Sequence, residues 1–450
     1  MYDVLLKGAS VVLESGCQRL DIAVAEGKIA KLCIPGEEVP EAKCVIDCTG
    51  KVIFPGAIDT HGHMLFRENF DVGTMNAAKG GVTTVVEMPL CNQNEHWPNT
   101  LTRELFEEKV ALGNSEAHVD FALWGGLTRT TMSRIRELHE AGCVGFKAFI
   151  SYAGEDYPYL DDYALMESMK QIRDLGSIIA IHAENESICS ALTKKYREEK
   201  RGPEFFEPSR PVIAEAEAAG RAAFFARKTG CKTVVCHVSC SEVLDEVLRN
   251  RTNGEQIYAE SCPHYLSLDT MDIARCAGFA KCSPPLRAPI EKDLLWERVA
   301  QGEVDVIGAD HSGYRTEEKE RDIWDAPGGF VGLDLFMQIL ISEGMNKRGL
   351  SAERIAEISS VNASKLLGLY PQKGCIAEGS DADFAIVDPD EEWVFHTADS
   401  FYIESDERYP VENRKFTGNV VVTMVRGEVV YENGKIVMPK GYGKFVRPQR

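Results

Sequence analysis

Val52-Ile-Phe-Pro-Gly-Ala-Ile58 runs directly into Asp59-Thr-His61-Gly-His63, and this stretch is the strongest indication of how the chain folds. Its first part is apolar and β-like, and its second part places two histidines two residues apart. Alternate residues of an extended strand project to the same side, so both imidazoles can reach one metal ion. Asp59 stands behind them as an orienting neighbour, and imidazole suits zinc, iron, nickel and similar metals. A single His-x-His pair also arises by chance, so the rest of the chain must supply the other ligands.

Four later stretches have the same character. Each is a short apolar, β-branched run of the kind that forms a strand buried on both faces of a parallel sheet. They are Gly145-Phe-Lys147-Ala-Phe-Ile150, Ile178-Ile-Ala-Ile-His182-Ala-Glu184, Val234-Val-Cys-His237-Val-Ser239 and Val304-Asp-Val-Ile-Gly-Ala-Asp310-His311-Ser312. Three of them carry a polar residue at the C-terminal end, whereas Lys147 lies inside its run.

Strand-like and helix-like segments alternate along the centre of the chain. Strands are expected near residues 52, 83, 119, 145, 178, 233, 256 and 304, and amphipathic helices at 101–113, 131–141, 161–175, 214–229, 241–250 and 290–302. Eight strands alternating with helices predict an α/β fold of the (β/α)8, TIM-type barrel class. Functional residues of such barrels lie at the C-terminal ends of the strands, which is where the histidines and Asp310 fall.

Both ends of the chain are rich in β-like segments. Residues 2–12, 21–25 and 29–32 precede the barrel, and 383–388, 420–426 and 429–431 follow it. The Asn433-Gly434 pair is a strong hairpin signal. Because a lead-in of this length would struggle to bury a core alone, we expect the two ends to pair into one small β-sandwich domain. Residues 1–51 and 375–450 would form this domain, and residues 52–374 the barrel.

The composition is that of a globular protein with a strong negative charge. The 450 residues are 44% hydrophobic and 27% charged, and the net charge is −20. This balance argues against nucleic acid and anionic membranes as partners. The first residues do not resemble a signal peptide, and no apolar run is long enough to span a bilayer. Fourteen scattered cysteines are expected to be free thiols in a reducing cytoplasm.

The candidate metal ligands are His61, His63, Lys147, His182, His237 and Asp310. A structural role is the more common one for any single histidine, but four of the ten end or directly follow predicted barrel strands. The joint pattern therefore favours metal binding. A lysine among apolar neighbours is costly unless it is paired or modified, so a buried ion pair remains an alternative for Lys147. His311 adjoins Asp310 and is placed to line the same site.

Such a ligand set can hold two metal ions. Two metals would turn a bridging water into hydroxide and also polarise a carbonyl. Asp310 could accept the proton of the attacking water and pass it to a leaving nitrogen. This pattern predicts hydrolysis of an unactivated amide. The chain has no Gly-x-Ser-x-Gly elbow or other convincing nucleophile motif that would favour a covalent mechanism.

The motifs of this chain resemble those of the cyclic amidohydrolases, which are hydantoinase, dihydropyrimidinase, allantoinase and dihydroorotase. The similarity runs essentially end to end. It is carried by Pro55-Gly-Ala-Ile-Asp-Thr-His61-Gly-His63, Gly80-Gly-Val-Thr-Thr-Val-Val-Glu-Met-Pro89, Gly145-Phe-Lys147, His182-Ala-Glu184, Ser209-Arg-Pro211, His237-Val-Ser239, Glu260-Ser-Cys-Pro-His-Tyr265, Lys281-Cys-Ser-Pro-Pro-Leu-Arg287, Asp310-His-Ser312, Asn362-Ala-Ser-Lys-Leu-Leu-Gly368 and Gly379-Ser-Asp-Ala-Asp383.

The resemblance implies the amidohydrolase-superfamily barrel with a binuclear zinc centre. The ligands of the more buried ion would be His61, His63 and Asp310. Those of the other ion would be His182 and His237. A carboxylated Lys147 would bridge the two ions. The resemblance also implies a homotetramer or homodimer and a small-molecule cyclic ureide as substrate.

The substrate is less clearly marked than the metal centre. Dihydroorotase-like sequences place an arginine two residues after the second metal histidine, where this chain has Leu65. Tyr152 matches the tyrosine with which hydantoinases and dihydropyrimidinases hold the oxyanion, and Ser283 matches the serine that contacts the ring imide. A rim tyrosine and a turn serine are the structural alternatives. Gly328-Gly329 and Val119–Gly126 look more like allantoinase and L-type hydantoinases.

The leading prediction is therefore a binuclear-metal enzyme that opens the ring amide of allantoin or a 5-substituted hydantoin. Asp310 and Tyr152 are its predicted catalytic residues, and Tyr152, Ser283 and Gly328 are predicted to bind substrate. Dihydropyrimidinase is the first alternative and dihydroorotase is less favoured. A non-catalytic binding protein on the same fold is the least favoured, because all six ligand candidates are present.

Overall fold

Parallel strands form the centre of the computed structural model, which describes residues 1–35, 41–91, 97–252, 254–402 and 404–449. The strands are β6 (Ala57–His63), β7 (Val82–Glu87), β8 (Asp120–Leu123), β9 (Gly125–Gly126), β10 (Phe146–Phe149), β11 (Ile178–His182), β12 (Lys232–Val235), β13 (Ile257–Ser261), β14 (Val306–Ile307) and β15 (His311–Ser312). Hydrogen bonds join them in two series, β15-β6-β7-β8 and β9-β10-β11-β12-β13-β14. β8 continues into β9 and β14 into β15, so the series close into eight strand positions. The predicted (β/α)8 barrel is confirmed.

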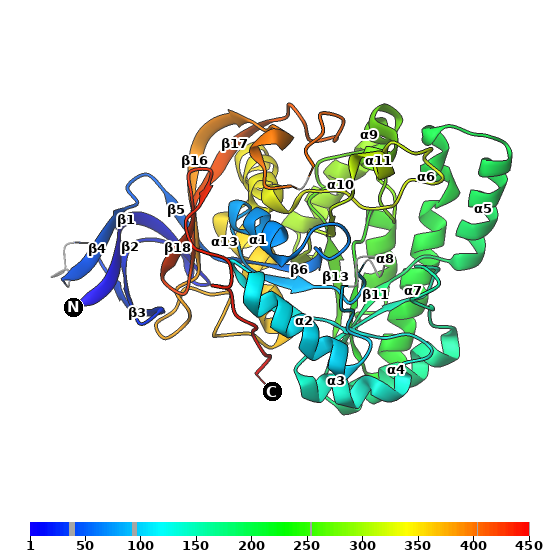
Figure 1. Cartoon of the computed structure of the whole chain (residues 1–450), viewed down its shortest axis with the longest axis horizontal. Helices are drawn as coiled ribbons and strands as arrows, with labels where there is room; N and C mark the ends of the chain where they lie inside the picture. Colours follow the sequence, from blue (N-terminus) through cyan, green and yellow to red (C-terminus); the bar gives the residue numbers. More distant parts are fainter. Residues whose placement is uncertain (36–40, 92–96, 253, 403, 450) are drawn as a thin grey trace.

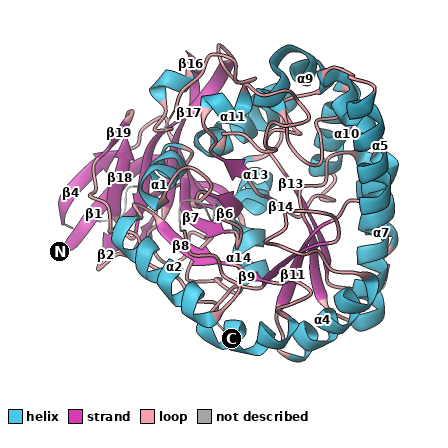
Figure 2. Ribbon diagram, turned by 45° about the vertical axis from the view of Figure 1, so that its right-hand side comes forward, coloured by secondary structure: helices cyan, strands magenta, loops and turns pink. Residues whose placement is uncertain are grey.

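Helices form an outer layer around these strands, as Figure 2 shows. Those in the first part of the barrel are α1 (Phe70–Lys79), α2 (Arg103–Glu116), α3 (Ile135–Ala141), α4 (Asp162–Asp174), α5 (Glu186–Glu198), α6 (Phe206–Ser209) and α7 (Val212–Thr229). The later ones are α8 (Ser241–Arg249), α9 (Thr270–Cys276), α10 (Pro289–Ala300), α11 (Thr316–Lys319), α12 (Phe336–Ile339), α13 (Ala352–Ala356) and α14 (Asn362–Leu367). α4 illustrates the pattern: Leu165, Met169 and Ile172 are buried at helical spacing, and the Asp161 side chain caps its N-terminus.

The two ends of the chain meet in one nine-stranded sheet, visible beside the barrel in Figure 1. Its strands are β1 (Tyr2–Leu13), β2 (Gly16–Ala25), β3 (Lys28–Cys33), β4 (Ala42–Asp47), β5 (Val52–Pro55), β16 (Phe384–Val394), β17 (Lys415–Val425), β18 (Glu428–Glu432) and β19 (Lys435–Ile436). β5 pairs with β1 on one side and β16 on the other, and so joins the two ends. The expected single strand near residue 52 is thus two strands, because the chain leaves the terminal sheet after Pro55 and enters the barrel at Ala57. The hairpin at Asn433-Gly434 is confirmed.

A buried charge cluster connects the barrel to the terminal sheet. The Lys373 ammonium lies between the carboxylates of Asp120, at the start of β8, and of Asp381 and Asp383, just before β16. The Nζ–Oδ distances to Asp381 and Asp383 are 3.0 Å and 2.7 Å, and none of the four side chains is more than 4% exposed. The lysine, with Arg426 on Asp120 and Lys28 on Asp381, therefore offsets the charge of carboxylates that would otherwise repel one another.

Replacing Lys373 with methionine is expected to lower the free energy of unfolding by about 3–5 kcal/mol, because three buried carboxylates lose the cation that they share. Arg426 still contacts Asp120 and Lys28 still contacts Asp381, so Asp383 is the carboxylate most affected. Denaturant unfolding measures the effect. Lys365→Met is the control, since the Lys365–Glu14 pair is 47% and 39% exposed and such a pair is worth at most about 1 kcal/mol. Equal losses in the two variants would contradict the role of the cluster.

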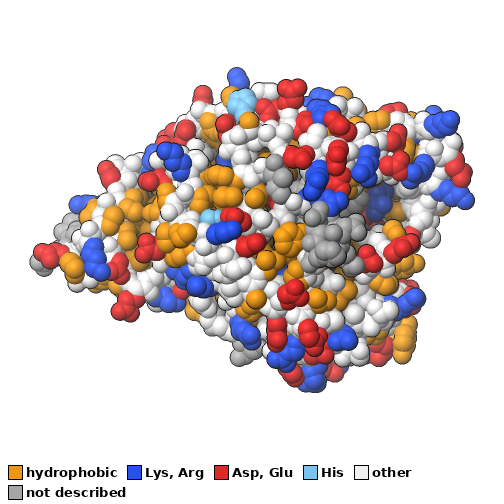
Figure 3. All heavy atoms as spheres, in the orientation of Figure 1, with side chains coloured by type: hydrophobic (Ala, Val, Ile, Leu, Met, Phe, Trp, Pro, Cys, Tyr) orange, Lys and Arg blue, Asp and Glu red, His pale blue; other side chains and the backbone are white. Residues whose placement is uncertain are grey.

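The surface carries both signs of charge. On the face seen in Figure 3, basic and acidic side chains are interspersed, which differs from the continuous basic surface that nucleic-acid binding needs. No helix in the described part of the chain has the length and apolar character to cross a membrane. All fourteen cysteines lie in the described part, and none of them forms a disulfide there.

Candidate metal centre and active site

The six predicted ligands meet at one end of the barrel. His61 and His63 lie on β6, Lys147 on β10 and His182 at the end of β11. His237 follows β12 by two residues, and Asp310 lies between β14 and β15. All six line one cavity of about 540 Å³. The C-terminal ends of the strands therefore form the site, as the barrel class predicts.

The ligand atoms are close enough to surround metal ions. Asp310 Oδ1 lies 3.3 Å from His61 Nε2 and 3.5 Å from His63 Nε2. Lys147 Nζ is 3.4 Å from His61 Nε2, and His182 Nδ1 is 3.0 Å from His237 Nε2. Imidazole nitrogens that face one another and a carboxylate at such distances form a donor set that zinc and similar ions accept.

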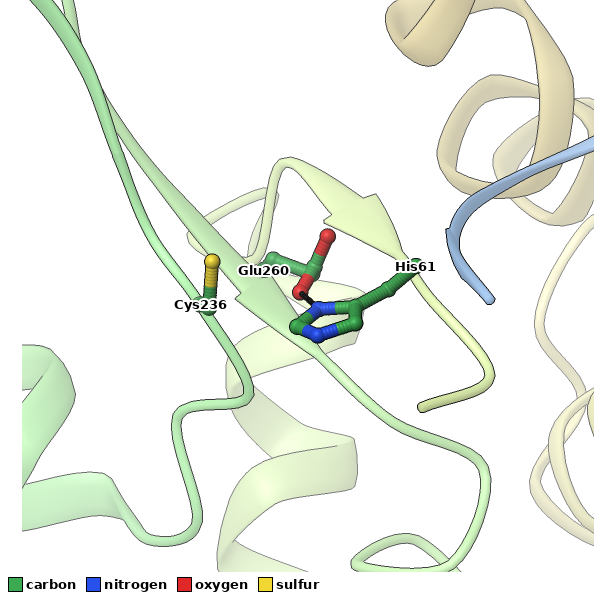
Figure 4. Close-up of side chains that lie close together, drawn as sticks. All are labelled: His61, Cys236 and Glu260. Atoms are coloured by element: carbon green, nitrogen blue, oxygen red, sulfur yellow. Dashed lines mark hydrogen bonds and ion pairs between the residues drawn. The ribbon is translucent and has the colours of Figure 1, made fainter. Parts of the chain in front are cut away.

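Two carboxylates outside the cavity decide which ring nitrogen faces inward. Glu260 Oε1 contacts His61 Nδ1 at 2.7 Å, which leaves His61 Nε2 for the cavity. Figure 4 shows Glu260 reaching to His61 Nδ1 from β13. Glu184 Oε2 contacts His182 Nε2 at 2.8 Å, which leaves His182 Nδ1 for the cavity. Arg210 holds Glu184 from the other side through two nitrogens. Such partners fix the tautomer and orientation of a ligating histidine.

Burial favours the neutral form of three of the facing imidazoles, which is the form that binds metal. Burial lowers the pKa of His61 and of His182, and lowers that of His237 well below its ordinary value. Burial alone would raise the pKa of Asp310, but the neighbouring His61 and His63 rings hold it well below its usual range. Asp310 is therefore an ionised acceptor.

Cys236 lies near His61 and Glu260 (Figure 4) but is a poor ligand. Burial raises the pKa of its thiol to about 12, and metals bind thiolates rather than thiols. Glu260 is also engaged, since it accepts hydrogen bonds from Thr60 Oγ1 and from the backbone N–H of His237. This trio is thus a support for His61 and not a second metal site.

The backbone around the ligands is unusually constrained. His237 and Asp310 have φ angles of 39° and 48°, in the left-handed region that side chains rarely adopt. Strained residues of this kind cluster at functional sites. Position 308 requires a glycine, because a Cβ there would lie only 2.8 Å from the Cβ of His61. Asp59 Oδ1 accepts the N–H groups of His61 and Ala309 at 3.0 Å and 2.7 Å, so it orients the backbone that carries the ligands.

The predicted substrate residues line the same cavity. Tyr152, Ser283 and Gly328 all belong to its wall. Tyr152 is 60% exposed at the rim, and its backbone N–H donates to Glu186. A Cβ at Gly328 would lie 3.5 Å from Ser283 Oγ, so these two residues are neighbours. His311 is not among the lining residues, because its ring nitrogens contact Glu68 and the N–H of Gly332.

Sequence reasoning gave no role to Glu260, Glu184 or Arg210. All three occur in the quoted motifs, but only as evidence of resemblance. Glu260 could have been found by the criterion that identified the ligands, because it is a charged residue near the C-terminal end of a buried apolar strand. The contact between Glu184 and Arg210 joins residues 26 apart in the chain and needed the fold to be seen.

The fold and this donor set are those of metal-dependent hydrolases, and the comparison with known proteins agrees. The model of the amidohydrolase family matches residues 52–430, and the chain belongs to that family. It is 35% identical to the L-hydantoinase of Paenarthrobacter aurescens, over 99% of this chain and 98% of the relative. It is 37% identical to an allantoinase of Escherichia coli, over 98% of each chain.

Comparison with solved structures narrows the subgroup of the family to which the chain belongs. The structure of "L-Hydantoinase (Dihydropyrimidinase) from Arthrobacter aurescens" matches with a TM-score of 0.94 and 35% identity, over 99% of this chain and 100% of that one. Within its family the protein is a cyclic amidohydrolase of the hydantoinase, allantoinase and dihydropyrimidinase type, a hydrolase of carbon–nitrogen bonds in cyclic amides.

Proposed function

We propose that the protein opens the ring amide of a five-membered cyclic ureide, either a 5-substituted hydantoin or allantoin. The observation that carries the proposal is the convergence of His61, His63, Lys147, His182, His237 and Asp310 in one cavity. A cavity of about 540 Å³ is of the size that small-molecule sites have. Membership of the family indicates the class of reaction, and the side chains that line the cavity indicate which substrate is favoured.

The donor set fits two divalent ions, for which zinc is our proposal. His61, His63 and Asp310 would hold one ion, and His182 and His237 the other. Lys147, carboxylated on Nζ, would be shared between them. The bound ions would supply Lewis acidity to the water and to the scissile carbonyl. In support of the carboxylation, Lys147 is 0% exposed, and among the described residues no ion pair joins it to a carboxylate.

Asp310 is the proposed general base and acid. Its ionised carboxylate would take a proton from the attacking water on an oxygen that faces the cavity, and deliver it to the leaving ring nitrogen. Tyr152 is proposed to donate a hydrogen bond from its hydroxyl to the oxyanion. Ser283 Oγ and the backbone of Gly328 are proposed to hold the ureide edge of the ring.

The cavity wall favours an apolar substituent on the ring. Beside the metal ligands, its lining includes the apolar and aromatic side chains of Phe66, Leu90, Phe149, Phe206, Tyr314 and Trp324, together with the polar residues Thr193, Arg210, Lys281 and Ser312. Aromatic and aliphatic side chains bind alkyl or aryl groups better than the polar ureido group of allantoin. We therefore rank a 5-substituted hydantoin ahead of allantoin.

Two alternatives carry different expectations. Dihydropyrimidinase activity, on a six-membered ring, remains the alternative because Tyr152 lines the cavity. Dihydroorotase activity is disfavoured, since Leu65 is buried and Arg67 donates two hydrogen bonds to Glu318, so no arginine at this turn is offered to a substrate carboxylate. A non-catalytic protein is disfavoured by the complete ligand set.

Ring-opening rates test the proposal. The zinc-loaded and manganese-loaded protein is assayed on allantoin, both enantiomers of 5-phenylhydantoin, dihydrouracil and dihydroorotate. We expect the highest kcat/KM on one hydantoin enantiomer. A preference for dihydrouracil would support the six-membered ring instead, and no opening of any ring would refute the proposed function.

Replacing Glu184 with glutamine is expected to weaken binding of one of two metal ions by about 10- to 100-fold, the usual cost of losing such a partner. The amide cannot accept from His182 and Arg210 as the carboxylate does. Metal titration followed by mass spectrometry measures the stoichiometry. Glu198→Gln, on the exposed face of α5, is the control and should bind both ions as wild type does. Full occupancy in Glu184→Gln at limiting metal would contradict the role.

The oligomeric state and the cellular compartment of the protein complete the proposal. We propose a homotetramer or homodimer, which light scattering of the purified protein measures. Cysteines without disulfides support a reducing compartment such as the cytoplasm.

A further inference from the structure

One wall of the cavity is a loop that follows α11. Within residues 323–329, Trp324, Gly328 and Gly329 line the cavity. In the described part of the chain, neither the N–H nor the C=O of Gly328 has a backbone hydrogen-bond partner, whereas the Gly329 N–H donates to Lys281 O at 2.8 Å. The Gly328 backbone therefore offers a hydrogen-bonding edge beside Ser283, and the position of that edge depends on what holds the loop.

Lys319 binds the C-terminal end of the loop. Its Nζ donates to Pro327 O at 3.0 Å and to Gly329 O at 2.5 Å, and the residue is 1% exposed. No ion pair joins it to a carboxylate in the described part of the chain. The two loop carbonyls accept its hydrogen bonds, and the Tyr314 ring centroid lies 5.4 Å from its Nζ. Burial, and then the charge of Lys281, lowers the pKa of Lys319 to about 7. A buried ammonium without a counter-ion is costly and needs a reason.

Lys281 holds the beginning of the same loop. Its Nζ donates to Ile323 O and to Ala326 O, each at 2.6 Å. It also lines the cavity and precedes Ser283 by two residues. The two lysines together bind four carbonyls of the seven-residue loop. Neither lysine is used in the chemistry proposed above.

The loop packs closely against β15, the strand that directly follows Asp310. Gly329 has a φ of 109°, and a Cβ there would lie 2.8 Å from Ser312, two residues after Asp310. Glycine adopts such a φ without strain, so the angle itself needs no support. The loop is held at this short distance from Ser312 by the carbonyls that the two lysines bind.

We propose that Lys319 and Lys281 are positioning residues for substrate recognition, which fix loop 323–329 so that the Gly328 backbone and Ser283 meet the ureide edge of the ring. This inference rests on the proposed function. It differs from a purely structural role, because the fixed segment is a cavity wall and not the barrel core. Loss of the lysine–carbonyl contacts should therefore weaken substrate binding more than it slows the chemical step.

The test compares Lys319→Met and Lys281→Met with Lys79→Met. Lys79 is the control, since it is 7% exposed and its Nζ donates to Asp399 O at 2.9 Å, away from the cavity wall. Unlike the two loop lysines it also pairs with a buried carboxylate, that of Asp334 at 3.4 Å, so any general loss of stability should be at least as large in Lys79→Met. We expect both loop variants to raise KM for the best cyclic substrate by about 10- to 100-fold, with a much smaller change in kcat. Lys281→Arg should restore most of the affinity, because a guanidinium can also donate to two carbonyls.

Hydrogen exchange provides a readout that needs no turnover. Amides of residues 323–329 should exchange faster in Lys319→Met and Lys281→Met than in wild type, and at the wild-type rate in Lys79→Met. If Lys319→Met does not fold, Lys281→Met carries the test, since its side chain is nearer the surface.

The outcomes separate this inference from the function on which it rests. Faster loop exchange together with a raised KM supports the positioning role. Unchanged loop exchange, or an equal loss of kcat and kcat/KM with KM unaltered, overturns it. A wild-type protein that opens no ring counts against the proposed function, and loop exchange then still decides whether the lysines hold the loop.

Discussion

Replacing Asp310 with asparagine is expected to lower kcat on the order of 10³-fold, within the range that a positioned proton-transfer group contributes. Asp310 is the ionised carboxylate of the cavity, within 3.5 Å of both His61 and His63. An amide oxygen can still contact a metal ion, but it cannot take a proton from water. We therefore expect the variant to keep much of its metal while it loses turnover. Steady-state kinetics on the best substrate and metal analysis of the same sample measure the two quantities.

Asp305→Asn is the matched control for this prediction. Asp305 precedes β14, and its carboxylate accepts from Arg251 and from the backbone N–H of Ala259. Its loss should lower stability and leave kcat near the wild-type value. If Asp310→Asn keeps activity within a few-fold of wild type, another group is the base. If it loses metal and activity in parallel, Asp310 is a ligand whose proton-transfer role is not separable.

The barrel and the positions of the candidate ligands could be predicted because two sequence signals coincide. Buried parallel strands read as short apolar runs, and barrel chemistry lies where these runs end. His182 ends β11 and His61 lies on β6, so their positions in the sequence already place them on one rim. Lys147 was recognisable for the opposite reason, as a charge that an apolar strand does not tolerate without a purpose.

Other features could not be read from the same patterns. The split between β5 and β6 depends on which partners Val52–Pro55 finds, and those partners are β1 and β16, far away in sequence. The lysine contacts to loop 323–329 are side chain to backbone bonds, which leave no periodic signal. Substrate choice also depends on such loops, since they form part of the cavity wall.

Replacing Lys147 with alanine is expected to remove metal and activity together, with a fall in turnover of at least about 10³-fold, because Lewis acidity and the shared ligand are lost at once. Lys147 Nζ lies 3.4 Å from His61 Nε2 inside a cavity that contains four imidazoles. A free ammonium there would repel metal ions, whereas a carboxylated amine would attract them. Metal analysis and kinetics on the purified variant measure both losses.

Short carboxylic acids decide between these two forms of Lys147. The alanine variant leaves space in which formate, acetate or propionate could stand where the carboxylated side chain stood, so these acids should restore part of the metal content and of the rate. Lys147→Met is the control, because its side chain fills that space and no acid should restore activity. Rescue in both variants would mean that the acid acts elsewhere. A Lys147→Ala protein that is fully metallated and active without any acid would refute the bridging role, because the remaining histidines and Asp310 would then hold the ions alone.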